Sequence, residues 1–119
     1  MYVPGTNGLS KEERLCGKTT VAALVSRGHW GTAGHLRYCW APREEGAAHS
    51  RILVSVPKKF FKRAVKRNLL KRRLREAYRT RKAVLTRPVD LMLVYSSAEI
   101  ADSAAIGAEV AAVLGRLAG

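Results

Sequence analysis

Apolar residues in the C-terminal half of this 119-residue chain recur with the period of an α-helix. From Ala64 onward, four of them stand at i, i+4, i+7 and i+8 and so share one helix face: Leu70, Leu74, Ala77 and Tyr78. Five more predict the buried stripe of a last helix, with Asp102 or Ser103 as its N-cap: Ile106, Val110, Val113, Leu114 and Leu117. Nearer the N-terminus, residues 18–27 predict a third helix that ends at Gly28.

Three other segments predict β-strands. Leu36, Tyr38 and Trp40 recur with a period of two, which is typical of a strand. Residues 51–56 are rich in β-branched side chains, and 89–95 form a nearly continuous apolar run, the mark of a strand covered on both faces. The gap between the first two strands suits an antiparallel hairpin, with room for another strand partner. Residues 30–34 are Gly-rich and predict a loop.

The resulting order is helix, two or three strands, helix, strand, helix. It predicts an α+β fold, α-β-β-(β)-α-β-α, in which one layer of helices packs against a small mixed β-sheet. The length fits a single domain, 1–119, with one modest core. Residues 1–8 predict a flexible arm, and Ser10 with Glu13 fits a capping box after it.

Charge is concentrated in one segment of the chain. Thirteen of the 22 basic residues lie within 58–82, together with a single acid, Glu76. This segment contributes +12 of the net charge of +13. A merely solvated helix face normally mixes both signs, whereas Lys and Arg near phosphates release condensed counterions. The excess therefore indicates a nucleic acid partner.

Targeting and redox signals are weak. No apolar run approaches the roughly 20 residues of a membrane span, and the N-terminus lacks a signal-peptide pattern. We therefore expect no membrane partner and a cytoplasmic location. Cys16 and Cys39 lie far apart and are expected to be reduced thiols.

The segment 51–78 reads RILVSVPKKFFKRAVKRNLLKRRLREAY. It resembles the signature of the bacterial ribonuclease P protein component, a strand ending in Ser-Val-x-Lys-Lys followed by Ala-Val-x-Arg-Asn-x-x-Lys-Arg-x-x-Arg-Glu. Twelve positions match that pattern: Ser55, Val56, Lys58, Lys59, Ala64, Val65, Arg67, Asn68, Lys71, Arg72, Arg75 and Glu76. So many fixed positions in a short window are far more specific than a lysine-rich run.

The resemblance implies both a fold and a function. The fold is a mixed sheet with an unusual left-handed β-α-β crossover. The function is that of a protein subunit that binds the catalytic RNA of ribonuclease P and helps it remove the 5′ leader of precursor tRNA. The RNA performs the chemistry with magnesium ions, so the protein itself is expected to hold no cofactor, metal or catalytic side chain.

The resemblance also implies two binding regions. The loop and basic helix contact the RNA, which gives ten candidates: Lys58, Lys59, Lys62, Arg63, Arg67, Asn68, Lys71, Arg72, Arg75 and Arg79. Asn68 equally fits a role in bonding local backbone. The leader enters a cleft between the N-terminal helix and the sheet, for which Val21, Val25 and Ser55 are the candidates.

This chain departs from the family pattern in three places. Leu69 replaces a second Arg after the Arg-Asn pair, and the loop before Ala64 is one residue longer, with Phe60 and Phe61 in it. Val21 and Val25 stand where the family places two aromatic residues. Valine cannot stack on a base, so recognition of the leader is expected to use other contacts.

Two further readings compete with this one. Trp30, Tyr38 and Trp40 suit base stacking or core packing, with core packing favoured for the last two. The three histidines, His29, His35 and His49, lack partners at metal-ligand spacing, and no acidic cluster exists to hold catalytic ions. A different class of protein also fits the composition, namely a non-catalytic binding module such as a ribosomal or nucleoid protein. The motif at 64–76 argues against that class.

Overall fold

The computed structural model describes residues 13–15, 17–44, 46–47 and 49–118. The expected arm at 1–8, Ser10 of the expected capping box and Cys16 lie outside these residues. The first half holds α2 (Lys18–Arg27), β1 (His29–Ala33), β2 (Leu36–Pro42) and β3 (Arg51–Ser55). The second half holds α3 (Ala64–Arg81), the 3₁₀ turn η2 (Lys82–Val84), β4 (Val89–Tyr95) and α4 (Ser103–Ala118). The predicted α+β order is confirmed, with three strands before α3.

The four strands form one mixed sheet in the order β1-β2-β4-β3. β4 pairs antiparallel with β2 and parallel with β3, so α3 connects two parallel neighbours. The predicted hairpin between β2 and β3 is therefore wrong, because β4 lies between them. β4 takes this central place because both of its faces are apolar and almost all of its residues are buried.

The segment at 30–34, predicted as a loop, belongs to a β-hairpin. β1 pairs antiparallel with β2 from His29↔Trp40 to Ala33↔Leu36. Gly34, with φ at 58°, supplies the left-handed backbone that so short a turn requires. Cross-strand pairing thus outweighs the weak strand preference of a Gly-rich sequence.

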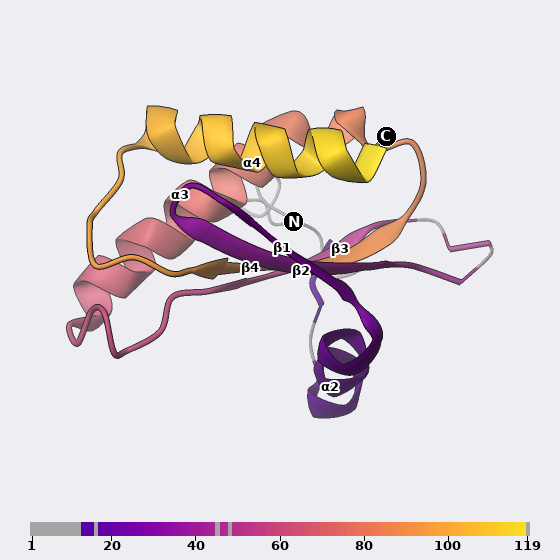
Figure 1. Ribbon diagram of the computed structural model, residues 1–119, viewed down its shortest axis with the longest axis horizontal. Helices are drawn as coiled ribbons and strands as arrows, with labels where there is room; N and C mark the ends of the chain where they lie inside the picture. The colour runs from indigo at the N-terminus through magenta and orange to yellow at the C-terminus, as the bar shows by residue number, and fades with distance from the viewer. Residues whose placement is uncertain (1–12, 16, 45, 48, 119) are drawn as a thin grey trace, which may run out of the picture.

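Helices cover both faces of the sheet, so the expected single layer is also wrong. Figure 1 shows α3 and α4 on one side and α2 alone on the other. Alternate residues of each strand accordingly enter two cores. The larger core lies under α3 and α4 and includes Leu91, Leu93 and Tyr95. The smaller core lies under α2 and is built from Leu15, Leu24, Cys39, Ala41 and Met92.

The predicted helix stripes are confirmed. All four stripe residues of α3 and all five of α4 are buried. Asp102 is the N-cap of α4, since its Oδ1 accepts a hydrogen bond of 2.8 Å from the Ala105 backbone N–H. At the end of α2, a Cβ on Gly28 would collide with Cys39 Sγ, so a glycine lets the helix approach β2 closely.

A buried carboxylate ties the α2 side of the sheet together. Asp90 on β4 is 3% exposed and accepts hydrogen bonds of 2.7 and 2.8 Å from Nε and Nη2 of Arg51 on β3. Arg43 Nε lies 3.8 Å from the same carboxylate, just beyond β2. Because a buried charge is tolerated only when it is paired, Asp90 fixes three strands relative to one another.

No helix within the described residues is long and apolar enough to cross a bilayer.

Leu74 and Val65 give a matched test of this packing. Both lie on α3, but Leu74 is fully buried and Val65 is 75% exposed. We expect Leu74→Ala to lower the free energy of unfolding by about 2–5 kcal/mol, because it leaves a cavity in the larger core. Val65→Ala should change it by less than about 0.5 kcal/mol. Urea unfolding measures both, and an equal effect of the two changes would contradict the assigned helix face.

Candidate nucleic-acid interface

The loop between β3 and α3 presents an exposed basic surface. Lys58, Lys59, Lys62 and Arg63 are all exposed, and Lys59 Nζ lies 5.0 Å from the Phe60 ring centroid. Phe61 points inward and is buried against Tyr95, with ring centroids 5.9 Å apart. The two phenylalanines in this longer loop therefore anchor it to the core, and its cations stay in solvent.

Arg67 fixes this loop to the first turns of α3. Its Nη1 donates hydrogen bonds of 2.8 Å to the carbonyl oxygens of both Phe61 and Lys62. These bonds occupy part of the guanidinium and leave the remaining N–H donors to solvent. The structure thus gives Arg67 a positioning role that the sequence did not indicate.

The outer face of α3 holds the other predicted cations. Asn68, Arg72 and Arg75 are exposed, and Lys71 is partly buried. Arg79 is paired with Glu76 one turn earlier, and this hydrogen bond raises the pKa of the guanidinium. The outer face therefore has a partly neutralised end at Arg79 and an uncompensated centre at Arg72 and Arg75.

Arg75 has a like-charged neighbour from another part of the chain. Burial and then the charge of Arg14 lower the pKa of its guanidinium. Arg14 is held there because it forms an isolated parallel bridge to Ile52 at the free edge of β3. Sequence reasoning missed Arg14, because nothing in the spacing of the chain places residue 14 beside residue 75.

Three further cations of the basic segment are bonded within the fold. Arg73 Nη1 donates a 2.7 Å hydrogen bond to the Ala101 carbonyl oxygen, and Arg81 bonds the Ala77 carbonyl and the Thr80 hydroxyl. Lys82 forms an ion pair with Glu13. The basic segment thus divides into residues that hold helices in place and residues that face solvent.

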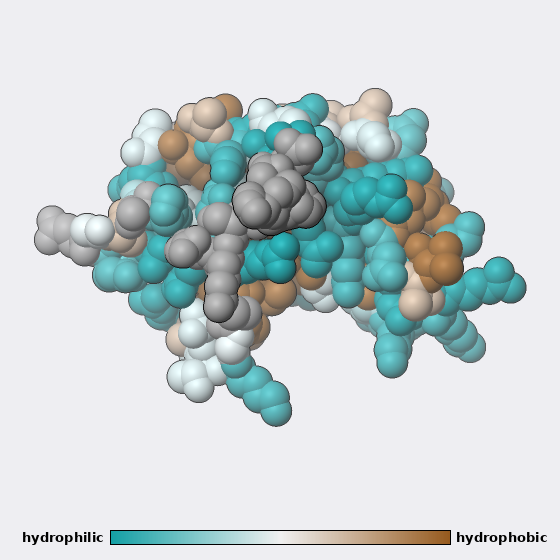
Figure 2. Space-filling view, turned by 180° about the vertical axis from the view of Figure 1, so that it is seen from behind, coloured by the Kyte–Doolittle hydropathy of each residue, from teal (hydrophilic) through white to brown (hydrophobic). Residues whose placement is uncertain are grey.

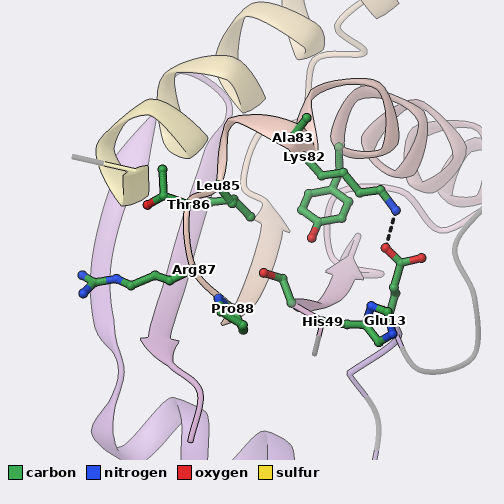
Figure 3. A pocket seen from close by; sticks show the side chains of 10 residues that line it. Glu13, His49, Lys82, Ala83, Leu85, Thr86, Arg87 and Pro88 are labelled. Carbon is green, nitrogen blue, oxygen red and sulfur yellow. Dashed lines mark hydrogen bonds and ion pairs between the residues drawn. The ribbon is translucent and has the colours of Figure 1, made fainter. Parts of the chain in front are cut away.

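The Lys82–Glu13 pair borders a polar pocket of about 380 Å³, seen in Figure 3. Tyr78 and Ser50 also line this pocket, and burial raises the pKa of the Tyr78 hydroxyl to about 12. Arg87 extends away from the pocket. The ion pair between Glu13 and Lys82 joins the N-terminal segment to η2, directly after α3.

A groove lies on the opposite side, between α2 and the sheet. It has a volume of about 580 Å³ and is mostly apolar, lined by Leu15, Gly17, Lys18, Val21, Ala22, Val25 and Leu53. Val21 and Val25 thus line one groove. Lys18 shares their helical spacing, a signal from which it could have been predicted.

Ser55 lies on the α2 side of the sheet but beyond the groove lining. It pairs with Val94 on β4, two residues further along β3 than Leu53. Its neighbours Val54 and Val56 are buried. Ser55 therefore occupies the sheet surface between the groove and the basic loop.

Figure 2 shows the molecule from behind, with α2 again at the bottom. Hydrophilic surface projects at the end where the loop at 57–63 lies, and the outline is recessed between that end and α2. Hydrophobic surface is visible beside α2. A recess with cations at one end and apolar walls suits a flexible polyanion with apolar bases, that is, single-stranded nucleic acid.

The three histidines do not form a site. His29 packs on Trp40 with ring centroids 5.1 Å apart, and His49 lines the polar pocket. His35 Nδ1 lies 2.6 Å from Glu109 Oε2 and ties the β1–β2 turn to α4. Within 13–15, 17–44, 46–47 and 49–118, no three His, Cys, Asp or Glu side chains are grouped so as to hold a metal ion.

The fold and the charge distribution define a basic α+β protein with a candidate nucleic-acid interface. Residues 9–118 match the family model described as Ribonuclease P. The chain is 41% identical to the ribonuclease P protein component of Porphyromonas gingivalis over 98 residues, 82% of this chain and 72% of that protein. The chain belongs to the ribonuclease P protein family. It is the protein subunit of an RNA-catalysed endoribonuclease that acts in tRNA 5′ maturation, and it associates with the ribonuclease P RNA.

Solved structures agree on the fold. The chain superimposes on the ribonuclease P protein of Thermotoga maritima with a TM-score of 0.76 at 25% identity, covering 90% of this chain and 99% of that one. For the Staphylococcus aureus protein the TM-score is 0.75 at 22% identity, covering 86% and 92%.

The His35–Glu109 pair predicts a pH-dependent stability. The hydrogen bond that His35 Nδ1–H donates to the Glu109 carboxylate raises the pKa of the imidazole above 6.5. The stability that this pair contributes is complete below the unfolded pKa and is lost as pH rises through the folded pKa. We expect His35→Gln to destabilise the protein more at about pH 6 than at about pH 9, as measured by chemical unfolding. In Glu109→Gln protein, the same change at His35 should have a nearly pH-independent effect. If His35→Gln lowered the free energy of unfolding of the parent chain equally at both pH values, the charged pair would be contradicted.

Proposed function

We propose that the solvent-facing cations of the β3–α3 loop and of α3 bind the catalytic RNA, while the groove under α2 receives the 5′ leader of precursor tRNA. The observation that supports this division is the split within the basic segment. Some of its cations bond the fold, while the side chains of five others have no hydrogen bond or ion pair in the described part of the chain: Lys58, Lys62, Arg63, Lys71 and Arg72. Cations that no part of the fold uses are available to phosphates.

The geometry of the loop supports this assignment. Arg67 bonds the loop to the first turns of α3, the helix that carries Arg72 and Arg75, and Phe61 anchors the same loop in the core. The charge of Arg14, which lowers the pKa of Arg75, adds to the positive potential of this helix. Lys59 on the loop and Asn68 on the helix are exposed as well.

Shape supports the second half of the proposal. The groove is apolar and open, and the strand surface that leads from it toward the loop carries Ser55 and Val94. An unpaired leader strand presents flat, apolar bases and a charged backbone at once. In this proposal magnesium ions bound by the RNA cleave the phosphodiester, and the protein positions the substrate.

Salt dependence tests the basic face. Each phosphate contact contributes about 0.7 to 0.9 to the slope of log K against log salt, so changing Arg72 and Arg75 together to Ala should flatten that slope by about 1.4 to 1.8. Both side chains are exposed, so the double variant should remain folded. Arg87→Ala, on the exposed connector before β4, serves as the control and should leave the slope nearly unchanged. An unchanged slope in the folded double variant would contradict the assignment.

Reconstitution tests whether the RNA performs the cleavage while the protein only assists it. Protein alone should not cleave precursor tRNA at any magnesium concentration. Added to a ribonuclease P RNA, it should restore cleavage at low magnesium, because it neutralises charge and holds the leader. Cleavage by RNA-free and nuclease-free protein would overturn the proposal, as would the lack of any effect on the RNA.

A further inference from the structure

One large aromatic side chain lies exposed on the α2 side of the sheet. Trp30 on β1 is 43% exposed. It pairs across the hairpin with Cys39, whose side chain enters the core under α2, so Trp30 projects from that same side. Tyr38 and Trp40 project to the other side and pack in or against the larger core. On the α2 side of the sheet, Trp30 is thus the one aromatic side chain among the described residues that is exposed to solvent.

A guanidinium lies over the Trp30 ring. Arg37 Cζ is 4.8 Å from the ring centroid, close enough for a cation–π contact. Arg37 pairs with Thr32, so it is the diagonal cross-strand neighbour of Trp30 on the same side of the sheet. Its side chain is exposed and has no hydrogen bond or ion pair in the described part of the chain. The pair therefore holds the indole in place and leaves the N–H donors of Arg37 available to a phosphate.

Arg37 connects Trp30 to the sheet surface beside the groove. The cross-strand neighbours of Trp30 itself, Cys39 and then Met92, are buried under α2. Arg37 pairs with Val94, and Val94 pairs with Ser55, two residues beyond the groove residue Leu53 on β3. Two strand spacings separate Arg37 from Ser55, about 10 Å, a distance that a single strand of a few nucleotides spans.

The groove itself offers no aromatic ring. Its helix presents Val21 and Val25, which contribute apolar contact and no stacking. Stacking on an aromatic side chain is the main sequence-tolerant contact by which proteins hold single-stranded bases. The exposed indole with its adjacent cation has the two parts that such a contact needs.

We propose that Trp30, supported by Arg37, is the base-stacking site for a nucleotide of the 5′ leader. This inference rests on the proposed function of the groove and names the residue that supplies the missing stacking. Arg37 pairs with the adjoining phosphate, so the two side chains bind one nucleotide unit.

Binding of substrate by the reconstituted holoenzyme tests the stacking site. Precursor tRNA with a single-stranded leader is compared with mature tRNA lacking it. We expect Trp30→Ala to weaken precursor binding by roughly 5- to 100-fold, as for the loss of one stacked base, and to leave mature tRNA binding unchanged. Trp30→Phe should retain most of the affinity. Val84→Ala, an exposed apolar change on η2, is the matched control and should alter neither.

Leader binding in the groove and base stacking on Trp30 are contradicted by different results. If the parent holoenzyme binds precursor and mature tRNA equally, the proposed leader contact is wrong. If the parent prefers precursor and Trp30→Ala protein keeps the full preference, the stacking site is wrong.

Fluorescence provides a readout that does not depend on the stability of the Ala variant. In Trp40→Phe protein, Trp30 is the only tryptophan. Its emission in the holoenzyme should be quenched by precursor tRNA and unaffected by mature tRNA. Equal emission in the two complexes would overturn the inference.

Discussion

The burial of β4 on both faces is the constraint on which the rest of the molecule depends. Leu91 and Leu93 face α3 and α4, while Met92 enters the core under α2. One strand thus lies between two helix layers, α3 and α4 on one side and α2 on the other (Figure 1). The first layer carries the exposed cations of α3, and the second borders the apolar groove. A strand with only one apolar face would leave one of these layers without a core to pack on.

Basic residues of similar sequence context serve different ends in this fold. Arg67, Arg73 and Arg81 bond backbone carbonyls, which fixes the loop before α3 and the contact between α3 and α4. Arg72 and Arg75 remain in solvent because the helix period turns them away from Leu70 and Leu74. A high local charge is therefore compatible with a well-packed helix, since part of the charge is used within the fold.

Periodic segments were predictable from the sequence, and pairings between distant segments were not. The bounds of α2, the start of α3 at Ala64 and the buried stripes follow from local patterns and are confirmed. β1 was missed because its strand state comes from pairing with β2 and not from its own residues. The β2–β3 hairpin was wrong for a related reason, because β4, which follows α3 in the chain, lies between these two strands. Within the candidate interface, the motif indicated the cations, but the Arg14–Arg75 and Trp30–Arg37 neighbours exist only in the fold.

The concentration of charge in α3 and the loop before it has a consequence for how the protein responds to ions. Thirteen basic residues and one acid lie within 58–82, and mobile ions screen the repulsion among such cations. Added salt also weakens the attachment of a basic surface to a polyanion. The same ions therefore relieve the repulsion within this segment and compete with a nucleic acid for its solvent-facing cations.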